Sequence, residues 1–311
     1  MTLNISPKLF TVDNVVRGIG LGMSLLKKTI KKIPLAVNYD LTWKCNLRCN
    51  HCYFFSSASE LDFPEKKELT DEEWIKVFKH HKNMGINSAA LTGGEPTLRM
   101  NLLEEAVKIF PSVQIASNGI IKMPWFKTKK QPIYWVSLDG REETHNAIRG
   151  AEIFHKVTEN IRNDKRVLIS TTLTAMNYNE IEDVVKIAHD LGVSGLFFLM
   201  YTGYTGDPLL LKGKILRKTV KNILKAMKDY GDFILISKKM LELYVTKAHV
   251  KTCMMRSGTV RCYYPNGQRK FCVMGNSPKL CANCGCIVPV GSHALSSLDV
   301  ETIEKLKKFP F

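Results

Sequence analysis

The sequence predicts an α/β fold, with a parallel sheet covered by helices and a small cysteine-rich C-terminal domain after it. Short apolar segments alternate with segments of helical period over residues 34–205. Of the nine cysteines, six lie within residues 253–286, where the chain becomes rich in turns. These two observations divide the chain into an α/β part and an appended cysteine-rich part.

Six apolar segments are the predicted strands of the sheet. They cover residues 34–41, 88–93, 113–118, 133–140, 166–174 and 195–200. The predicted helices cover residues 70–85, 101–110, 154–164 and 180–192. The first helix has recognisable ends, with Thr70 as N-cap, Glu73 in the capping-box position and Gly85 at its C-terminus. Because strands that alternate with helices run parallel, we expect the helices on the outside of the sheet.

The segments outside this alternation set the predicted domain boundaries. A basic amphipathic helix at residues 210–231 leaves the sheet, and a short surface helix is expected at residues 297–309. The predicted parts are a basic amphipathic N-terminal segment (1–33), the α/β domain (34–205), a helical linker (206–245) and the cysteine-rich domain (246–311).

The N-terminal segment admits two interpretations. Residues 11–34 carry apolar side chains at helical spacing together with arginine and lysines, which is typical of a helix lying on a membrane interface. A helix packed across the bottom of the sheet is the alternative, favoured by Gly18, Gly20 and Gly22, which weaken a free-standing helix. The lysines follow the apolar stretch, which argues against a signal peptide, and no run of 18 apolar residues is present to span a bilayer.

Composition narrows the class of protein. The chain has 311 residues and a net charge of +16, which favours anionic partners. Because the lysines are spread along the chain, nucleic acid is not expected, and general solubility is the simplest explanation of the charge. The grouping of the cysteines differs from an extracellular disulfide scaffold and indicates metal–sulfur chemistry in a reducing cytoplasm.

Cys45, Cys49 and Cys52 form a Cys-x3-Cys-x2-Cys motif after the first predicted strand. Three thiolates within eight residues can hold three irons of a [4Fe–4S] cluster and leave the fourth iron open to another ligand. The loop at the C-terminal end of a strand is where (β/α) barrels place their chemistry. A zinc site completed by His51, or buried thiols without a metal, are the alternatives, although zinc ligands more often come in separated Cys-x2-Cys pairs.

This motif resembles the cluster motif of the radical SAM superfamily. The resemblance implies that S-adenosylmethionine chelates the open iron, and that the 5′-deoxyadenosyl radical from its reductive cleavage removes a hydrogen atom from a substrate. It also implies a partial (β/α)6 TIM-like barrel over residues 34–205, and a low-potential electron donor such as ferredoxin or flavodoxin. One departure is His51 at a position that is usually aromatic; its flat ring could still stack near adenine.

The resemblance also implies residues that bind S-adenosylmethionine. Gly93, Gly94 and Glu95 stand in a Gly-Gly-Glu-Pro element similar to the one that contacts the methionine amino group in the family. Arg149, in a segment similar to one found after the fourth strand, would pair with the methionine carboxylate through its guanidinium fork. The simpler interpretation of Gly93 and Gly94 is a turn, and that of Arg149 is a solvated arginine on a helix.

Polar side chains at the ends of the third and fourth strands complete this set. Ser117 and Asn118 stand at the end of the third strand, and Ser137 and Asp139 at the end of the fourth. In the family, residues at these strand ends commonly bind the ribose hydroxyls and the methionine carboxylate. Capping of the strand ends is the alternative, since Ser, Asn and Asp often take that role.

The C-terminal cysteines form a second candidate metal site. Cys253 and Cys272 flank a predicted hairpin that turns at residues 265–267, and Cys281 and Cys284 supply a Cys-x2-Cys pair. This spacing resembles the twitch half of the auxiliary-cluster (SPASM) domains and implies a second [4Fe–4S] cluster, with structural zinc as the alternative.

Cys262 and Cys286 remain spare in this ligand set, and either could replace a chosen ligand. Residues 278–286 also resemble the cysteine-rich end of radical SAM enzymes that act on hopanoids.

The sequence thus predicts a radical SAM enzyme that breaks an unactivated C–H bond. A membrane lipid of isoprenoid or hopanoid type is the first expected substrate, because of the basic N-terminal segment and the C-terminal likeness; the enzyme would then lie at the inner face of the membrane. A peptide or protein substrate is the alternative, and the lack of a winged peptide-binding domain before residue 34 counts modestly against it. A third reading, a non-catalytic iron–sulfur electron carrier, does not explain the Gly-Gly-Glu-Pro element.

Overall fold

The computed structural model describes residues 33–55 and 67–307. The basic amphipathic segment predicted at residues 1–33 therefore lies, apart from Ile33, outside the described residues. No helix within the described ranges combines the length and apolar character needed to cross a bilayer.

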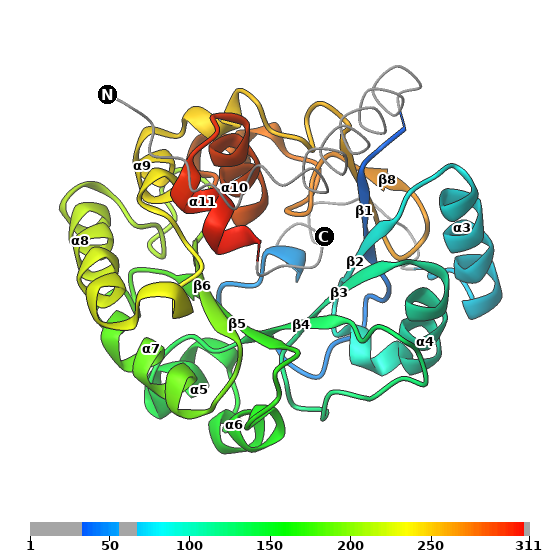
Figure 1. Cartoon of the computed structure of the whole chain (residues 1–311), viewed down its shortest axis with the longest axis horizontal. Helices are drawn as coiled ribbons and strands as arrows, with labels where there is room; N and C mark the ends of the chain where they lie inside the picture. The colour runs from blue at the N-terminus through cyan, green and yellow to red at the C-terminus, as the bar shows by residue number, and fades with distance from the viewer. Residues whose placement is uncertain (1–32, 56–66, 308–311) are drawn as a thin grey trace, which may run out of the picture.

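All six predicted strands are present and form a continuous parallel sheet. They are β1 (Ala36–Asp40), β2 (Ser88–Thr92), β3 (Ser112–Ser117), β4 (Ile133–Ser137), β5 (Val167–Leu173) and β6 (Gly195–Met200). Neighbouring strands pair in parallel in sequence order from β1 to β6, with Asp40 opposite Thr92 and Ser137 opposite Ser170 in the register. Figure 1 shows the strands in a curved arc with helices along its outer side, as in a partial barrel.

The helices that cover the arc are those of the predicted alternation, together with two others. They are α3 (Asp71–Asn83), α4 (Met100–Ile109), α5 (Glu142–Arg149), α6 (Phe154–Ile161), α7 (Ile181–Asp190) and α8 (Gly213–Tyr230). Helix α5 is an additional helix after β4, and α8, which was expected to leave the sheet, packs beside α7. The capping box predicted at the start of α3 is formed, because Thr70 accepts from Glu73 N and Glu73 accepts from Thr70 N.

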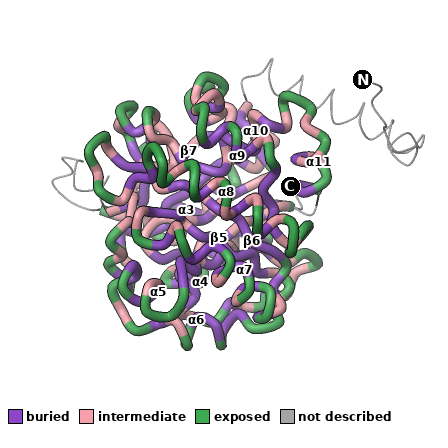
Figure 2. Tube along the Cα trace, turned by 90° about the vertical axis from the view of Figure 1, so that its left-hand side faces the viewer, coloured by how far each residue is buried: buried purple, intermediate pink, exposed green. Residues whose placement is uncertain are grey.

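Alternating burial along the strands separates the core from the barrel interior. In β2, Ala89 and Leu91 are fully buried in the layer shared with the helices, whereas Ala90 and Thr92 face an internal cavity. Helix α4 presents its buried residues at positions 102, 103, 106 and 107, the spacing of one helical face. Figure 2 shows the buried strands inside the molecule and most exposed residues on its outer turns.

The C-terminal region adds further helices and strands to this alternation. They are α9 (Lys238–Thr246), β7 (Val260–Tyr263), β8 (Arg269–Lys270), α10 (Ile287–Ser296) and α11 (Val300–Leu306), the last in the place of the predicted tail helix. The predicted hairpin is present as the antiparallel pair β7 and β8.

The cysteine-rich region is joined to both edges of the six-stranded arc. On one side β7 pairs in parallel with β1, so that the sheet order becomes β6-β5-β4-β3-β2-β1-β7-β8. On the other side Gly285 N donates to Thr202 Oγ1 at 2.8 Å, and Met200 N at the end of β6 donates to Gly285 O at 3.2 Å. Figure 1 shows this region across the open side of the arc. The region therefore closes the gap between β1 and β6.

Candidate active site

A cavity of about 280 Å³ lies inside the barrel at the carboxyl ends of the strands. All but one of the residues predicted to bind the cluster or S-adenosylmethionine line it. They are Cys45, Cys49, Cys52, Gly93, Gly94, Glu95, Ser117, Asn118, Ser137 and Arg149. Because parallel strands end at the same edge of a sheet, residues far apart in the sequence meet at one place.

The three cysteines lie on the loop after β1, and the Gly-Gly-Glu-Pro element is bonded to that loop. Gly94 N donates to Thr42 O at 2.9 Å, and Glu95 N donates to Lys44 O at 2.8 Å. A Cβ atom at Gly94 would stand 2.0 Å from Lys44 O, so only glycine allows the two loops to approach this closely.

Glu95 ties the Gly-Gly-Glu-Pro element to the end of β3. The side chain is 1% exposed, and its carboxylate accepts from Thr97 N and Oγ1, Ser117 Oγ and Asn118 N at 2.7–3.1 Å. Asn118 in turn donates to Asn46 Oδ1 at 2.7 Å, beside Cys45. Glu95 and Ser117 are thus bonded to the protein itself, and Asn118 connects the third strand to the cluster loop.

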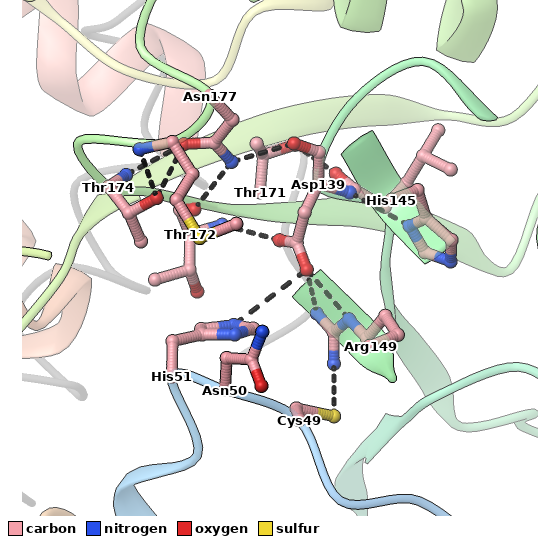
Figure 3. A network of polar contacts seen from close by, with 12 residues as sticks. Cys49, Asn50, His51, Asp139, His145, Arg149, Thr171, Thr172, Thr174 and Asn177 are labelled. Carbon is pink, nitrogen blue, oxygen red and sulfur yellow. Dashed lines mark hydrogen bonds and ion pairs between the residues drawn. The ribbon is translucent and has the colours of Figure 1, made fainter. Parts of the chain in front are cut away.

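Asp139 is the predicted site residue that does not line the cavity. Its side chain is fully buried and accepts from Arg149 Nε at 2.6 Å and Nη2 at 2.5 Å, and from Thr172 N at 3.1 Å (Figure 3). Burial alone would raise the pKa of this carboxyl, but the Arg149 guanidinium and the hydrogen bond from Thr172 N hold it below its usual value.

Arg149 uses one edge of its guanidinium for Asp139 and turns the other toward the cluster loop. Nη1 lies 3.8 Å from Cys49 Sγ, as Figure 3 shows. The expectation that Asp139 faces the cofactor therefore differs from its place in the structure, and the fork of Arg149 is already occupied by a carboxylate. The sequence did not show this ion pair, because the two side chains are ten positions apart. Asp139 precedes α5 and Arg149 is its last residue, and the fold of this segment brings them together.

The residues present fit the cofactors that the motif implies. His51 lines the cavity, and its Nδ1 atom is buried without a hydrogen-bond partner among the described residues, which leaves a polar atom available to a ligand. Burial lowers the pKa of His51 to about 4, so the ring is neutral at pH 7. Burial also raises the pKa of the Cys45 thiol to about 11 in the protein without a metal.

A single metal ion and a cluster require different arrangements of their thiol ligands. Within residues 33–55 and 67–307, no three Cys, His, Asp or Glu side chains form a group that could hold a single ion. Sulfur ligands of one zinc ion stand about 3.8 Å apart, because each Zn–S bond is about 2.3 Å. The thiolates of a [4Fe–4S] cluster bind one iron each and need no common centre.

The six C-terminal cysteines gather in a second group beside the cavity. Cys262 and Cys286 are buried in a small apolar cluster, and Cys253, Cys272 and Cys284 pack against it. Burial raises the pKa of Cys262 to about 12, while the nearby Lys270 ammonium opposes that change. Cys281 adjoins the same group, where the charges of Cys253 and Cys272 would act on it. Cys286, which was not among the four predicted ligands, also lines the cavity, so it belongs to both sites.

Sequence reasoning missed the interior lining of the barrel. These side chains come from alternate positions of the strands and from the segment after β6: Asn38, Gln114, Trp135, Ser170, Thr172 and Tyr201. The signal was present, because polar residues at inward positions of otherwise apolar strands mark a lined cavity rather than a packed core. Apart from Glu95 and Arg149, this lining carries neutral side chains and the thiols.

Comparisons with known proteins agree with this geometry. The family model described as Radical SAM superfamily matches residues 39–231. The sporulation killing factor maturation protein SkfB of Bacillus subtilis (strain 168) is 28% identical over 175 residues, which are 51% of this chain and 41% of SkfB. A probable GTP 3′,8-cyclase of Thermococcus kodakarensis is 30% identical over 49% of this chain and 52% of that protein. The match thus spans about half the length of these relatives or less.

Solved structures share the fold. SuiB of Streptococcus suis, bound to the precursor peptide SuiA, superposes with a TM-score of 0.61 at 16% identity and covers 88% of this chain and 67% of SuiB. Native anSMEcpe with bound AdoMet gives a TM-score of 0.62 at 21% identity over 79% of this chain and 76% of that one. Members of the family that the match identifies use a [4Fe–4S] cluster and S-adenosylmethionine. The chain is an enzyme that belongs to the radical SAM superfamily.

Proposed function

We propose that this enzyme uses a [4Fe–4S] cluster on Cys45, Cys49 and Cys52 to cleave S-adenosylmethionine and modifies a peptide. The observation that carries the proposal is the single cavity at the strand ends, which these thiols share with the Gly-Gly-Glu-Pro element. When bound, the cluster and S-adenosylmethionine supply a 5′-deoxyadenosyl radical that removes a hydrogen atom from the substrate.

The chain's own residues would hold and orient the cofactor. Gly93 and Gly94 let backbone approach the methionine end, since glycine adds no side chain there. Asn118 and Ser137 line the cavity at the ends of β3 and β4 and offer polar atoms to the ribose and carboxylate. Glu95 would act mainly by fixing the loop that carries these groups, because its carboxylate accepts four bonds from the protein.

The relatives favour a peptide over a lipid as the substrate. SkfB is named as a maturation protein, and SuiB is bound to a precursor peptide. The lipid reading depended on the segment at residues 1–33 and on a loose C-terminal likeness, and neither receives support from these relatives. The neutral, partly polar lining of the cavity also suits an uncharged amino-acid side chain.

The C-terminal cysteines would hold a second [4Fe–4S] cluster on Cys253, Cys272, Cys281 and Cys284. Because Cys286 lines the cavity and belongs to the same group of thiols, this cluster would stand beside the substrate. A cluster held there would supply an electron acceptor next to the substrate. Reduction of the first cluster requires a low-potential donor such as ferredoxin or flavodoxin, whose acidic surface would suit a chain of net charge +16.

Iron and sulfide content after anaerobic reconstitution tests the two cluster assignments. Wild type should bind about eight irons, and the Cys45/Cys49/Cys52→Ala variant should keep about four. A variant with the four C-terminal ligands replaced by alanine should also keep about four irons, and these should respond to S-adenosylmethionine in the EPR spectrum. If the first variant holds no iron, the C-terminal group binds zinc or no metal, and metal analysis distinguishes these outcomes.

The substrate class can be tested by stimulation of cofactor cleavage. Reduced holoenzyme is incubated with S-adenosylmethionine and either a library of ribosomally made peptides or liposomes of bacterial polar lipid, and 5′-deoxyadenosine is quantified. The proposal predicts faster cleavage with peptides, accompanied by a product peptide of altered mass. Stimulation by liposomes alone would overturn the peptide assignment.

A further inference from the structure

The end of helix α5 is attached to the cluster loop at several points. Asn50 N donates to Ile148 O at 2.9 Å, and Asn50 Nδ2 donates to Ala147 O at 3.0 Å. Gly150 ends the helix with φ 73°, and a Cβ atom there would stand 3.1 Å from Arg48 O. The part of the cluster loop around Cys49 is therefore docked on the end of the helix that carries Arg149.

Arg149 lies at this contact and is held in place from the other side. Its side chain is 9% exposed, Nε and Nη2 bind Asp139, and Nη1 faces Cys49 Sγ at 3.8 Å (Figure 3). Asp139 is fixed in turn by Thr172 N of β5 at 3.1 Å. A guanidinium with five donors can bridge a carboxylate and a sulfur at once, whereas an ammonium on a flexible stem cannot fix both in the same way.

We propose that Arg149 is a positioning residue for the iron–sulfur cluster, and that it fixes the Cys49 sulfur and stabilises the reduced cluster while Asp139 holds the guanidinium in place. This role differs from the one implied by the family resemblance, in which the same arginine pairs with the methionine carboxylate. The inference rests on the proposed ligand role of Cys49.

The electrostatic sign follows from the charge of the cluster. Reduction adds a negative charge, and a buried positive charge beside a ligand sulfur stabilises the reduced form and raises the reduction potential. Removal of Arg149 should therefore make the cluster harder to reduce. A hydrogen bond to a charged group changes an equilibrium constant by about tenfold or more, so we expect an effect of about this size on reduction of the cluster.

The test is a redox titration of reconstituted holoenzyme followed by EPR, using the signal that changes when S-adenosylmethionine is added. Arg149→Met should lower the equilibrium constant for reduction of that cluster about tenfold, equivalent to about 59 mV for one electron. Arg149→Lys keeps the charge and should recover part of this shift. Iron content, circular dichroism and thermal unfolding show whether each variant is folded and loaded.

Arg166→Met is the matched control. Arg166 is also buried and paired with an aspartate, Asp164, at 2.5 Å, but it stacks on Trp125 at the other end of the sheet and does not line the cavity. It should lower stability and leave the potential unchanged.

The outcomes separate this inference from the proposed function. If the Cys45/Cys49/Cys52→Ala variant keeps the signal that responds to S-adenosylmethionine, the ligand assignment fails and the inference fails with it. If that signal is lost as proposed, but loaded Arg149→Met retains the wild-type potential and only binds S-adenosylmethionine more weakly, the positioning role alone is overturned. If Arg149→Met does not fold, Arg149→Gln takes its place as the variant without the charge, and a wild-type potential in loaded Arg149→Gln together with weaker S-adenosylmethionine binding overturns it.

Discussion

At the residue scale, Glu95 belongs to the Gly-Gly-Glu-Pro element, yet its carboxylate accepts four hydrogen bonds from the protein itself. Burial raises the pKa of its carboxyl, while four donors from Thr97, Ser117 and Asn118 favour the ionised form. Two of these donors are backbone N–H groups, those of Thr97 and Asn118. The carboxylate thus fixes the strand ends on which the cavity is built.

Glu95→Gln should therefore damage the scaffold as well as the site. The amide keeps one acceptor oxygen but turns an NH2 group toward a backbone N–H, so a buried donor loses its partner. We expect a loss of about 1–3 kcal/mol in the free energy of unfolding of the metal-free protein, measured in urea. Glu104→Gln on the exposed side of α4 is the control and should change little. Equal stability of the two variants would contradict this account.

Lys270 provides a second residue-scale prediction. Its ammonium is 1% exposed, pairs with fully buried Asp40 at the end of β1, and donates to Val273 O at 3.0 Å. Lys270→Met leaves a buried carboxylate without its partner, which should cost about 3–5 kcal/mol. The double variant Lys270→Met/Asp40→Asn should recover much of this loss in thermal unfolding.

The pH dependence of Lys270→Met checks the physical cause. Burial already raises the pKa of Asp40, and Lys270 opposes that change. Without Lys270 the folded-state pKa of Asp40 rises further, so the folded protein binds a proton that the unfolded chain releases. Stability of the variant should therefore increase as the pH falls toward 5, relative to the double variant. A constant difference between the two variants would contradict a buried, unpaired carboxylate.

At the element scale, the six strands of the arc were predictable because each is apolar and flanked by helical periodicity. The pairing of β7 with β1 was not, since β7 has four residues and its partner lies more than 200 positions earlier in the chain. Short strands that add to an existing edge take their stability from the partner rather than from their own sequence. The hairpin turn at residues 265–267 was still visible, because turn chemistry is local.

The contact of the C-terminal region with β6 depends on one glycine. A Cβ atom at Gly285 would stand 1.8 Å from Met200 O, a backbone atom that cannot move without displacing the end of β6. Gly285→Ala should therefore open this contact, lower the thermal unfolding temperature and increase proteolysis of residues after 246. Gly291→Ala, six positions later, meets nothing closer than 3.7 Å and should leave both measurements near wild type.

At the scale of the whole molecule, the cysteine-rich region closes the barrel and brings one of its thiols, Cys286, to the cavity. The sequence could place both cysteine groups on loops, but it could not show that they adjoin one cavity. That proximity follows from pairing of β7 with β1 and from the bonds of Gly285 at β6. Asp139, by contrast, lies beside Arg149 at the end of α5 and does not line the cavity, where strand-end position alone had suggested it.

The whole molecule also contains four buried histidines that should make it sensitive to acid. Burial lowers the pKa of His51, His81, His145 and His249 to about 4. The unfolded chain binds protons at these positions near pH 6.5, whereas the folded protein does not until about pH 4. Stability of the metal-free protein should therefore fall as the pH decreases from 6.5 to 4.

His81→Gln isolates one of these groups. His81 Nδ1 lies 2.7 Å from Tyr39 Oη and Nε2 lies 3.3 Å from Tyr263 Oη, while His80 and Arg261 add positive charge nearby. Glutamine keeps an acceptor for Tyr39 but binds no proton. The number of protons taken up on unfolding, which sets the slope of the unfolding free energy against pH, should therefore fall by about one. His155→Gln is the control, because His155 is 81% exposed. An unchanged slope in His81→Gln would mean that His81 takes up its proton in the folded protein and does not contribute to acid unfolding.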